Sequence, residues 1–313
     1  MSHRDNAAAR RPAVGVDLGG TKIAAALVAA DGSVLARASA PTPAAAGPAA
    51  ILDAIAALAA RVAGGADVRG LGLGAAGVID PGSCRVVDAT DVLPGWPGTD
   101  LRSGLLRRLS GLVPRVEAVN DVHAHALGEA WLGAGRHART ALLVAFGTGI
   151  GGSYIVGGRP AVGAHAVAGH VGHVPSAEAA GLECTCGGSG HLEAVASGPA
   201  VHRRYLAAGG DPAAEDTRAV FDRAAGGDAL AASAIATAAR AAGGALGGFA
   251  NALDPHAIVV SGGLAAAGRL WWDPLLAAYA ANVVGALSAT VPTRALLGAD
   301  AAVVGGASLI LRD

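Results

Sequence analysis

Two short glycine-rich segments carry residue types that can hold phosphates. The first is Asp17–Lys22, with the sequence DLGGTK, and the second is Gly147–Gly152, with the sequence GTGIGG. Glycine has no side chain, so backbone N–H groups can approach a phosphate closely, and Thr21 adds a hydroxyl donor. Asp17, at the end of an apolar run, could hold Mg²⁺ through water. Each segment is a candidate phosphate site, although a tight hairpin with a surface lysine explains the first one equally well.

The second segment and Gly72–Gly77 also fit G-x-G-x-x-G, the fingerprint of dinucleotide-binding dehydrogenases. That fingerprint requires a helix directly after the last glycine. Here Ser153–Val156 and Val78-Ile79 have the apolar pattern of strands. In a chain with 48 glycines, chance matches to this motif are expected. A dehydrogenase is therefore disfavoured.

A polar pair, Asn120-Asp121, separates the apolar run Val116–Val119 from a predicted helix at His123–Leu132. Aspartate at such a junction usually caps the helix N-terminus. The same carboxylate at a strand end, facing a cleft, can instead act as a general base. The pair by itself leaves both interpretations open.

Four residues with metal-ligand chemistry form an H-x₁₀-C-x-C-x₄-H pattern: His173, Cys184, Cys186 and His191. Four nitrogen and sulfur ligands suit a closed tetrahedral Zn²⁺ site. The surrounding stretch is rich in glycine, so these cysteines are not expected to be core residues. The pattern predicts a structural zinc site, with a pair of free thiols as the alternative.

Composition restricts the class of protein. The chain has 313 residues, of which 52% are hydrophobic and 15% charged, so a large core is available and global disorder is excluded. A net charge of −1 gives no basic field for nucleic acid. Three cysteines do not build a disulfide framework, which favours a reducing compartment. No signal-like segment and no stretch of about 18 uninterrupted apolar residues is found, so we expect a cytoplasmic protein without a membrane partner.

The elements that position these residues follow one pattern twice. Apolar runs at Val14–Leu18 and Ile23–Ala29 flank the first glycine segment, and Ala141–Phe146 and Tyr154–Val156 flank the second. Later helices follow in both halves, the first of them predicted at Ala49–Val62 from its helical spacing. This internal duplication predicts two related α/β lobes with a cleft between them.

Taken together, the motifs resemble those of the ROK family of sugar kinases and regulators. The resemblance runs from about Ala13 to Ile310. Its motifs are DLGGTK at 17–22, VND at 119–121, GTGIGG at 147–152, GHVGH…CTCGGSGHLE at 169–193, ASG at 196–198, DP at 254–255 and VVSGG at 259–263. The resemblance implies an α/β chain with the two-lobed, actin-like ATPase (ribonuclease H-like) fold and a central interdomain cleft.

The expected organisation has a flexible arm at 1–12 and an N-terminal lobe at 13–118, completed by a C-terminal helix at about 300–313. The C-terminal lobe follows at 119–299 and contains the zinc-binding segment 163–193.

The resemblance also implies roles for single residues. Asp121 becomes the catalytic base of an ATP-dependent phosphorylation at the 6-hydroxyl of a hexose. Sugar contacts fall on Asn120, His170, His173 and Glu193. The ATP site, with its Mg²⁺, takes Asp17, Gly19, Gly20, Thr21, Lys22, Gly147, Thr148, Gly149, Gly151 and Gly152, with Gly262 and Gly263 near the adenosine. The Zn²⁺ ligands are His173, Cys184, Cys186 and His191, and His173 also contacts the sugar through its other ring nitrogen.

Two departures from the family pattern bear on the substrate and the metal. The family's usual third zinc cysteine is His191 here, and its usual glutamate in E-x-G-H is His170. The H-x-G-H form is similar to that of bacterial N-acetylmannosamine kinases, so N-acetylmannosamine is the predicted sugar. A glucokinase of the same family and a non-catalytic sugar-sensing relative are the alternatives.

The resemblance further suggests a homodimer. Family repressors carry an N-terminal winged helix, and since DLGGTK begins at residue 17, we expect no such DNA-binding segment and no nucleic-acid partner.

Overall fold

A computed structural model describes residues 11–312. Most of the predicted arm, residues 1–10, lies outside the described part. The chain folds into two compact units. Among the described residues, unit 1 contains 11–137, 155–168 and 296–312, and unit 2 contains 138–154 and 169–295. Unit 1 thus runs to His137, beyond the boundary that sequence analysis places at residue 118.

The strands and helices of the described residues follow one another in groups along the chain. The strands are β1 (Ala13–Leu18), β2 (Lys22–Val28), β3 (Val34–Pro41), β4 (Leu71–Ala75), β5 (Val78–Asp80), β6 (Arg85–Asp88), β7 (Val116–Asn120), β8 (Thr140–Phe146), β9 (Ile150–Val156), β10 (Arg159–Pro160), β11 (Ala257–Ser261) and β12 (Thr293–Arg294). The α-helices are α2 (Gly47–Ala63), α3 (Leu101–Arg108), α4 (Asp121–Trp131), α5 (Glu193–Ala196), α6 (Gly198–Ala207), α7 (Thr217–Ala225), α8 (Ala229–Leu253), α9 (Arg269–Asn282) and α10 (Ala301–Leu311).

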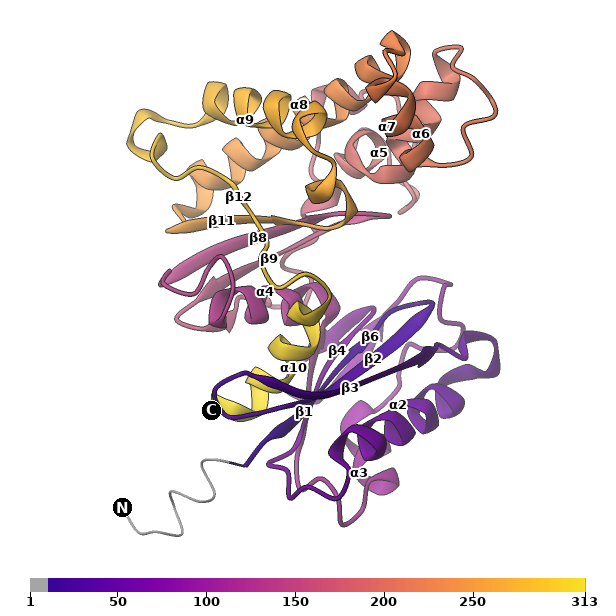
Figure 1. Cartoon of the computed structure of the whole chain (residues 1–313), viewed down its shortest axis with the longest axis vertical. Helices are drawn as coiled ribbons and strands as arrows, with labels where there is room; N and C mark the ends of the chain where they lie inside the picture. Colours follow the sequence, from indigo (N-terminus) through magenta and orange to yellow (C-terminus); the bar gives the residue numbers. More distant parts are fainter. Residues whose placement is uncertain (1–10, 313) are drawn as a thin grey trace. The chain divides into compact units, whose positions relative to one another are not determined.

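The sheet of unit 1 has the strand order β3-β2-β1-β4-β7. β1 pairs antiparallel with β2 and parallel with β4, and β4 pairs parallel with β7. The side chains of a strand alternate between its two faces. Val14, Val16 and Leu18 accordingly join the core under α2, whereas Ala13 packs with Val303 of α10. Helices α2 and α3 therefore cover one face of the sheet and α4 and α10 the other (Figure 1).

Helices α4 and α10 approach each other unusually closely. A Cβ at Gly305 of α10 would lie 1.7 Å from the backbone oxygen of Ala124 in α4. Only glycine permits this separation, because any side chain would displace one of the two backbones. The close contact fixes α4, the helix that begins at Asp121, against the C-terminal helix.

The second sheet repeats the order of the first, as β10-β9-β8-β11-β12. β8 pairs parallel with β11, and β11 pairs parallel with β12. The core of unit 2 contains residues of β8, β9 and β11 and of the long helix α8, which packs against α9, α7 and α6 (Figure 1). No helix directly follows Gly72–Gly77 or Gly147–Gly152, since β5 begins at Val78 and β9 runs from Ile150 to Val156. This confirms the observation that disfavoured a dehydrogenase.

Two helical stretches, 44–63 and 229–253, are long and apolar enough to cross a membrane by length and composition alone. In α8, residues such as Ile235 and Leu246 are fully buried in the core of unit 2. In α2, Ile51 and Ile55 are fully buried, while Asp53 and Arg61 are exposed. The buried apolar residues named here are thus used in packing within their own unit.

Candidate active site

Asp121 occupies the first turn of α4, directly after β7. The N-cap of this helix is Asn120, whose side-chain oxygen accepts hydrogen bonds from the backbone N–H groups of Val122 and His123. The capping role that sequence analysis considered for Asp121 therefore belongs to its neighbour. Asn120 takes this role because its extended backbone turns the side chain onto the helix end.

The Asp121 carboxylate is held in place but kept from full solvation. Its Oδ1 accepts from the Asn120 amide at 2.8 Å and from the Val122 N–H at 2.9 Å. Burial raises the pKa of Asp121, and these two hydrogen bonds partly oppose the rise. A carboxylate with a raised pKa is a better proton acceptor than an ordinary surface aspartate, which suits a general base.

Asp17 lies near the end of β1 in the same unit. Burial, and then the negative charge of Asp121, raise the pKa of Asp17 to about 6, while Lys22 lowers it. Two carboxylates that repel each other, with one nearby lysine, form a site where a divalent cation would be stabilising. The residues therefore fit the Mg²⁺ that ATP carries.

The turn after Asp17 is closed by backbone hydrogen bonds. The Gly19 N–H donates to the Lys22 carbonyl at 3.0 Å, and the Thr42 hydroxyl donates to the Gly19 carbonyl at 2.8 Å. Thr42, which directly follows β3, thus holds the turn in place, while Thr21 and Lys22 are exposed to solvent.

In unit 2, the glycine loop 147–152 is fastened to Glu193. One carboxylate oxygen of Glu193 accepts from the Ile150 N–H at 2.7 Å, and the other accepts from the Thr185 hydroxyl at 2.6 Å. A Cβ at Gly149 would lie 2.9 Å from Glu193 Oε2, so glycine makes room for this carboxylate. Glu193 therefore joins the glycine loop 147–152 to the cysteine segment. The hydrogen bond from Thr185 to Glu193 was not predicted from the sequence.

Gly262 and Gly263 directly follow β11, whose neighbour in the sheet is β8. Gly262 has a φ of 86° and accepts a hydrogen bond at its carbonyl from Ala265 N–H. The structure thus places this pair in unit 2, after a strand adjacent to the one that leads into the glycine loop.

His173, Cys184, Cys186 and His191 come together, with one ligand atom of each within 4.8 Å of the others. Cys184 Sγ lies 3.7 Å from His173 Nδ1, and Cys186 Sγ lies 3.2 Å from His191 Nδ1. In a tetrahedral zinc site, bonds of about 2.0–2.3 Å separate ligand atoms by roughly 3.4–3.8 Å. The four residues fit a zinc ion, and zinc binding stays a prediction.

His170 is exposed and precedes a short 3₁₀ helix, η2 (Val171–His173). Its ring centroid lies 6.0 Å from that of His173. The backbone here is tied to the glycine loop, because the Gly152 N–H donates to the Gly169 carbonyl at 2.7 Å. The structure thus brings the predicted sugar-contacting histidines of this segment and the second phosphate loop together within unit 2.

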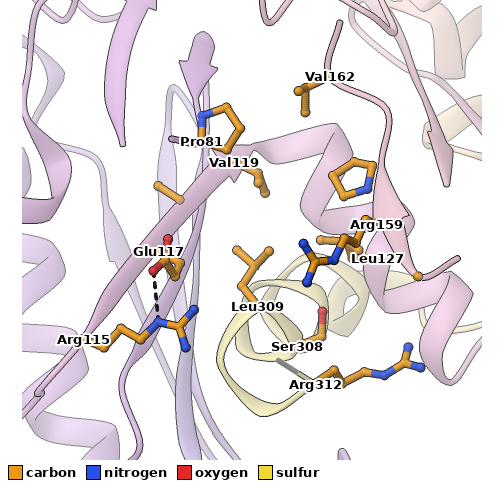
Figure 2. A pocket seen from close by; sticks show the side chains of 13 residues that line it. Pro81, Arg115, Glu117, Val119, Leu127, Arg159, Val162, Ser308, Leu309 and Arg312 are labelled. Carbon is orange, nitrogen blue, oxygen red and sulfur yellow. Dashed lines mark hydrogen bonds and ion pairs between the residues drawn. The ribbon is translucent and has the colours of Figure 1, made fainter. Parts of the chain in front are cut away.

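A cavity of about 260 Å³ in unit 1 contains none of the predicted site residues (Figure 2). Its wall includes Val119 of β7, one residue before Asn120, and the ion pair in which Arg115 Nε lies 2.9 Å from Glu117 Oε1. Its other lining residues are Pro81, Ala118 of β7, and residues from α4, from the 158–162 segment and from the end of α10. The predicted ATP, sugar and zinc residues therefore lie outside this cavity.

Comparisons with known proteins find relatives that match nearly the whole chain. The sequence model that describes the ROK family matches residues 13–313 of this chain. The glucokinase of Thermotoga maritima is 31% identical over 95% of this chain and 96% of its own length. The N-acetylmannosamine kinase of Shigella boydii is 35% identical over 67% of this chain and 68% of its own. A solved structure of a Streptomyces griseus ROK family glucokinase, in complex with glucose and AMPPNP, is 32% identical with a TM-score of 0.79, covering 96% of this chain and 100% of that chain.

Proposed function

The chain belongs to the ROK family, and from that premise we propose that it is an ATP-dependent sugar kinase acting on the 6-hydroxyl of a hexose. The predicted α/β, actin-like ATPase fold class is confirmed by the match to a ROK kinase structure over nearly the whole chain. The predicted cleft and the domain boundaries stay predictions.

The observation that carries the proposal is the Asp121 carboxylate, buried after β7 with a raised pKa and next to the Asn120 amide. In the proposed reaction, the oxygen of the 6-hydroxyl forms a bond to the γ-phosphorus of ATP, and the bond from that phosphorus to the β,γ-bridging oxygen breaks. The proton of the hydroxyl passes to Asp121, and ADP and the sugar 6-phosphate leave.

The remaining roles divide between the two units. Backbone N–H groups of the segments 19–22 and 147–152 would donate to the phosphates, where negative charge is concentrated. Asp17 would hold Mg²⁺, which, when bound with ATP, neutralises charge on the transferring phosphoryl group. Asn120, His170, His173 and Glu193 would bind and orient the sugar, and Gly262 and Gly263 would lie near the adenosine.

N-acetylmannosamine is the first candidate sugar and glucose the second. His170 supports the first, because a neutral imidazole can donate one hydrogen bond and accept another, whereas a carboxylate only accepts. The carbonyl of a 2-acetamido group can accept a hydrogen bond from the imidazole N–H, and its methyl group can pack against the flat ring. The match to glucokinases over nearly the whole chain supports the second.

The experiment is a coupled ADP-release assay across hexoses and N-acetylhexosamines, with ATP and polyphosphate as donors. We expect phosphorylation with ATP, fastest with N-acetylmannosamine, and Asp121→Asn protein supplies the background rate. Binding of one sugar without turnover of any would contradict the kinase and point to a sugar sensor. Light scattering of the purified protein tests the homodimer that the resemblance suggests.

A further inference from the structure

His123 is a buried polar side chain that the proposed reaction leaves without a role. It lies in the first turn of α4, two residues after Asp121, and is 3% exposed. Its Nε2 lies 3.0 Å from the backbone oxygen of Ala168. A carbonyl oxygen can only accept a hydrogen bond, so Nε2 must carry the hydrogen and donate it. The contact therefore links α4 to a loop 45 residues further along the chain.

The loop that receives this hydrogen bond leads directly to the predicted sugar contact. Residues 161–170 form neither strand nor helix. Their last residues are held by successive hydrogen bonds: the Ala168 N–H donates to the Val162 carbonyl at 3.1 Å, and the Gly169 carbonyl accepts from Gly152 N–H at 2.7 Å. The bond from His123 to the Ala168 carbonyl lies between these two. A side chain of α4 thus restrains the backbone immediately before His170.

We propose that His123 is a positioning residue for the sugar. Its imidazole fixes the peptide group that follows Ala168, and through it the start of the segment that presents His170. The bond lies two residues from the proposed base and two residues from the proposed sugar contact. Consecutive Cα atoms are about 3.8 Å apart, so the Cα of His170 lies within about 7.6 Å of that of Ala168. This inference rests on the proposed sugar-kinase function.

Burial of an imidazole needs a reason, because a polar side chain loses its hydrogen bonds to water when it leaves the solvent. The neighbouring buried positions of α4 include Ala124, Ala126 and Leu127, all apolar. An apolar residue at position 123 would pack at lower cost but could not donate to Ala168. The hydrogen bond to the loop is what the histidine adds.

The test compares two polar replacements that differ in reach. In His123→Gln the amide nitrogen lies as many bonds from Cβ as Nε2 does, so it can still donate to Ala168. In His123→Asn the amide nitrogen lies one bond closer to Cβ and falls short. We expect His123→Asn to raise the KM for the sugar by roughly 5- to 20-fold, which corresponds to the loss of one hydrogen bond. The Kd for the sugar, measured by calorimetry without ATP, should rise by the same factor. The KM for ATP should change by no more than about twofold. His123→Gln should recover most of the loss.

A chemically matched control exists in unit 2. His202 Nε2 lies 2.7 Å from the backbone oxygen of Ala214, which is the same kind of bond between two residues that are not among the predicted site residues. His202→Asn should lower Tm but leave both sugar constants unchanged.

Three results decide the proposal. Unchanged sugar KM and Kd in folded His123→Asn would overturn it and leave His123 a structural residue. Equal losses in His123→Gln and His123→Asn would also overturn it, because the donor would then not matter. If the wild-type protein binds a sugar but phosphorylates none, the proposed function fails, while the calorimetric Kd still decides the role of His123.

Discussion

The two five-stranded sheets have the same strand order but different residues at the ends of their strands. β1 and β8 hold the same position in their sheets, and each leads into a glycine turn. The next-to-last residue of β1 is Asp17, whereas that of β8 is Ala145. β7 is followed by Asp121, whereas β12 is followed by Ala295.

The two sheets thus share their strand order, whereas the side chains at the strand ends differ. Both sheets supply a glycine turn that is proposed to bind phosphate, but only the strand ends of unit 1 named above carry carboxylates with raised pKa values. Unit 2 instead carries the four cysteine and histidine residues that fit a zinc ion. One strand order thus supports the proposed proton acceptor in one unit and the four residues that fit a metal ion in the other.

The largest expected effect tests the carboxylate of unit 1. Asp121→Asn removes the proton acceptor but keeps a side chain of the same shape, so turnover should fall roughly 10²–10⁴-fold while Tm and sugar binding are retained. Steady-state kinetics and calorimetry measure both. Asp216→Asn, the same change at the N-cap of α7 in unit 2, is the control and should leave turnover unchanged. Near-wild-type turnover of Asp121→Asn would remove the proposed distinction between the two units.

The second prediction tests sugar choice in unit 2. His170→Glu replaces a donor and acceptor with an acceptor only, so the ratio of kcat/KM for N-acetylmannosamine to that for glucose should fall. One well-placed polar contact is worth about 1–3 kcal/mol, which corresponds to roughly 5- to 150-fold. Kinetics on both sugars measure the ratio. The exposed His165→Glu, in the loop before it, is the control. An unchanged ratio would leave N-acetylmannosamine and glucose equally supported as the substrate.

The third prediction tests the metal that would distinguish unit 2. Purified protein should contain one zinc per chain, and replacing Cys184 and Cys186 by serine should release it. The segment that carries His173 would then loosen, lowering kcat/KM for the sugar by roughly 10- to 100-fold. Elemental analysis measures the metal. Cys84→Ser, a fully buried cysteine in the core of unit 1, should keep the zinc. Wild-type protein without zinc, purified without chelator, would argue for free thiols.

The smallest expected effect concerns the stability of unit 1. The pKa of Asp17 is about 6 in the folded protein and 3.8 as its ordinary value. Between these values the folded protein binds more protons than the unfolded one, so stability contributed at this site falls as pH rises from about 4 to 6. Asp17→Asn should therefore stabilise the Mg²⁺-free protein at pH 7 by about 1–3 kcal/mol, with little gain at pH 4.

Thermal or urea unfolding at the two pH values measures this difference. Asp31→Asn is the control, because hydrogen bonds from Ser33 lower the pKa of Asp31 and the same gain should not occur. A gain of equal size at both pH values would show that the Asp17 effect does not come from its charge.

The sequence by itself determined which segments turn and which extend. Glycine turns and apolar runs are local features, so β1, β8 and the strand end at Asn120 were placed close to their observed bounds. The helix 269–282 was missed, and Pro274 inside it explains why: proline removes a backbone donor and normally ends a helix. Sequence analysis considered only Asp121 as the N-cap of α4, whereas the structure gives this role to Asn120; both residue types cap helices well, so residue type alone does not separate them.

Only the tertiary structure decided which distant groups share a hydrogen bond. Glu129 is 1% exposed, and its carboxylate accepts from the backbone N–H groups of Ala134, Leu296 and Leu297. Glu193 joins Ile150 to Thr185, and His123 donates to Ala168. Periodicity and spacing in the sequence indicate only the local structure of residues that are close together along the chain. These partners lie up to 168 residues apart, and packing of the sheets and helices alone brings a buried polar group to its partner.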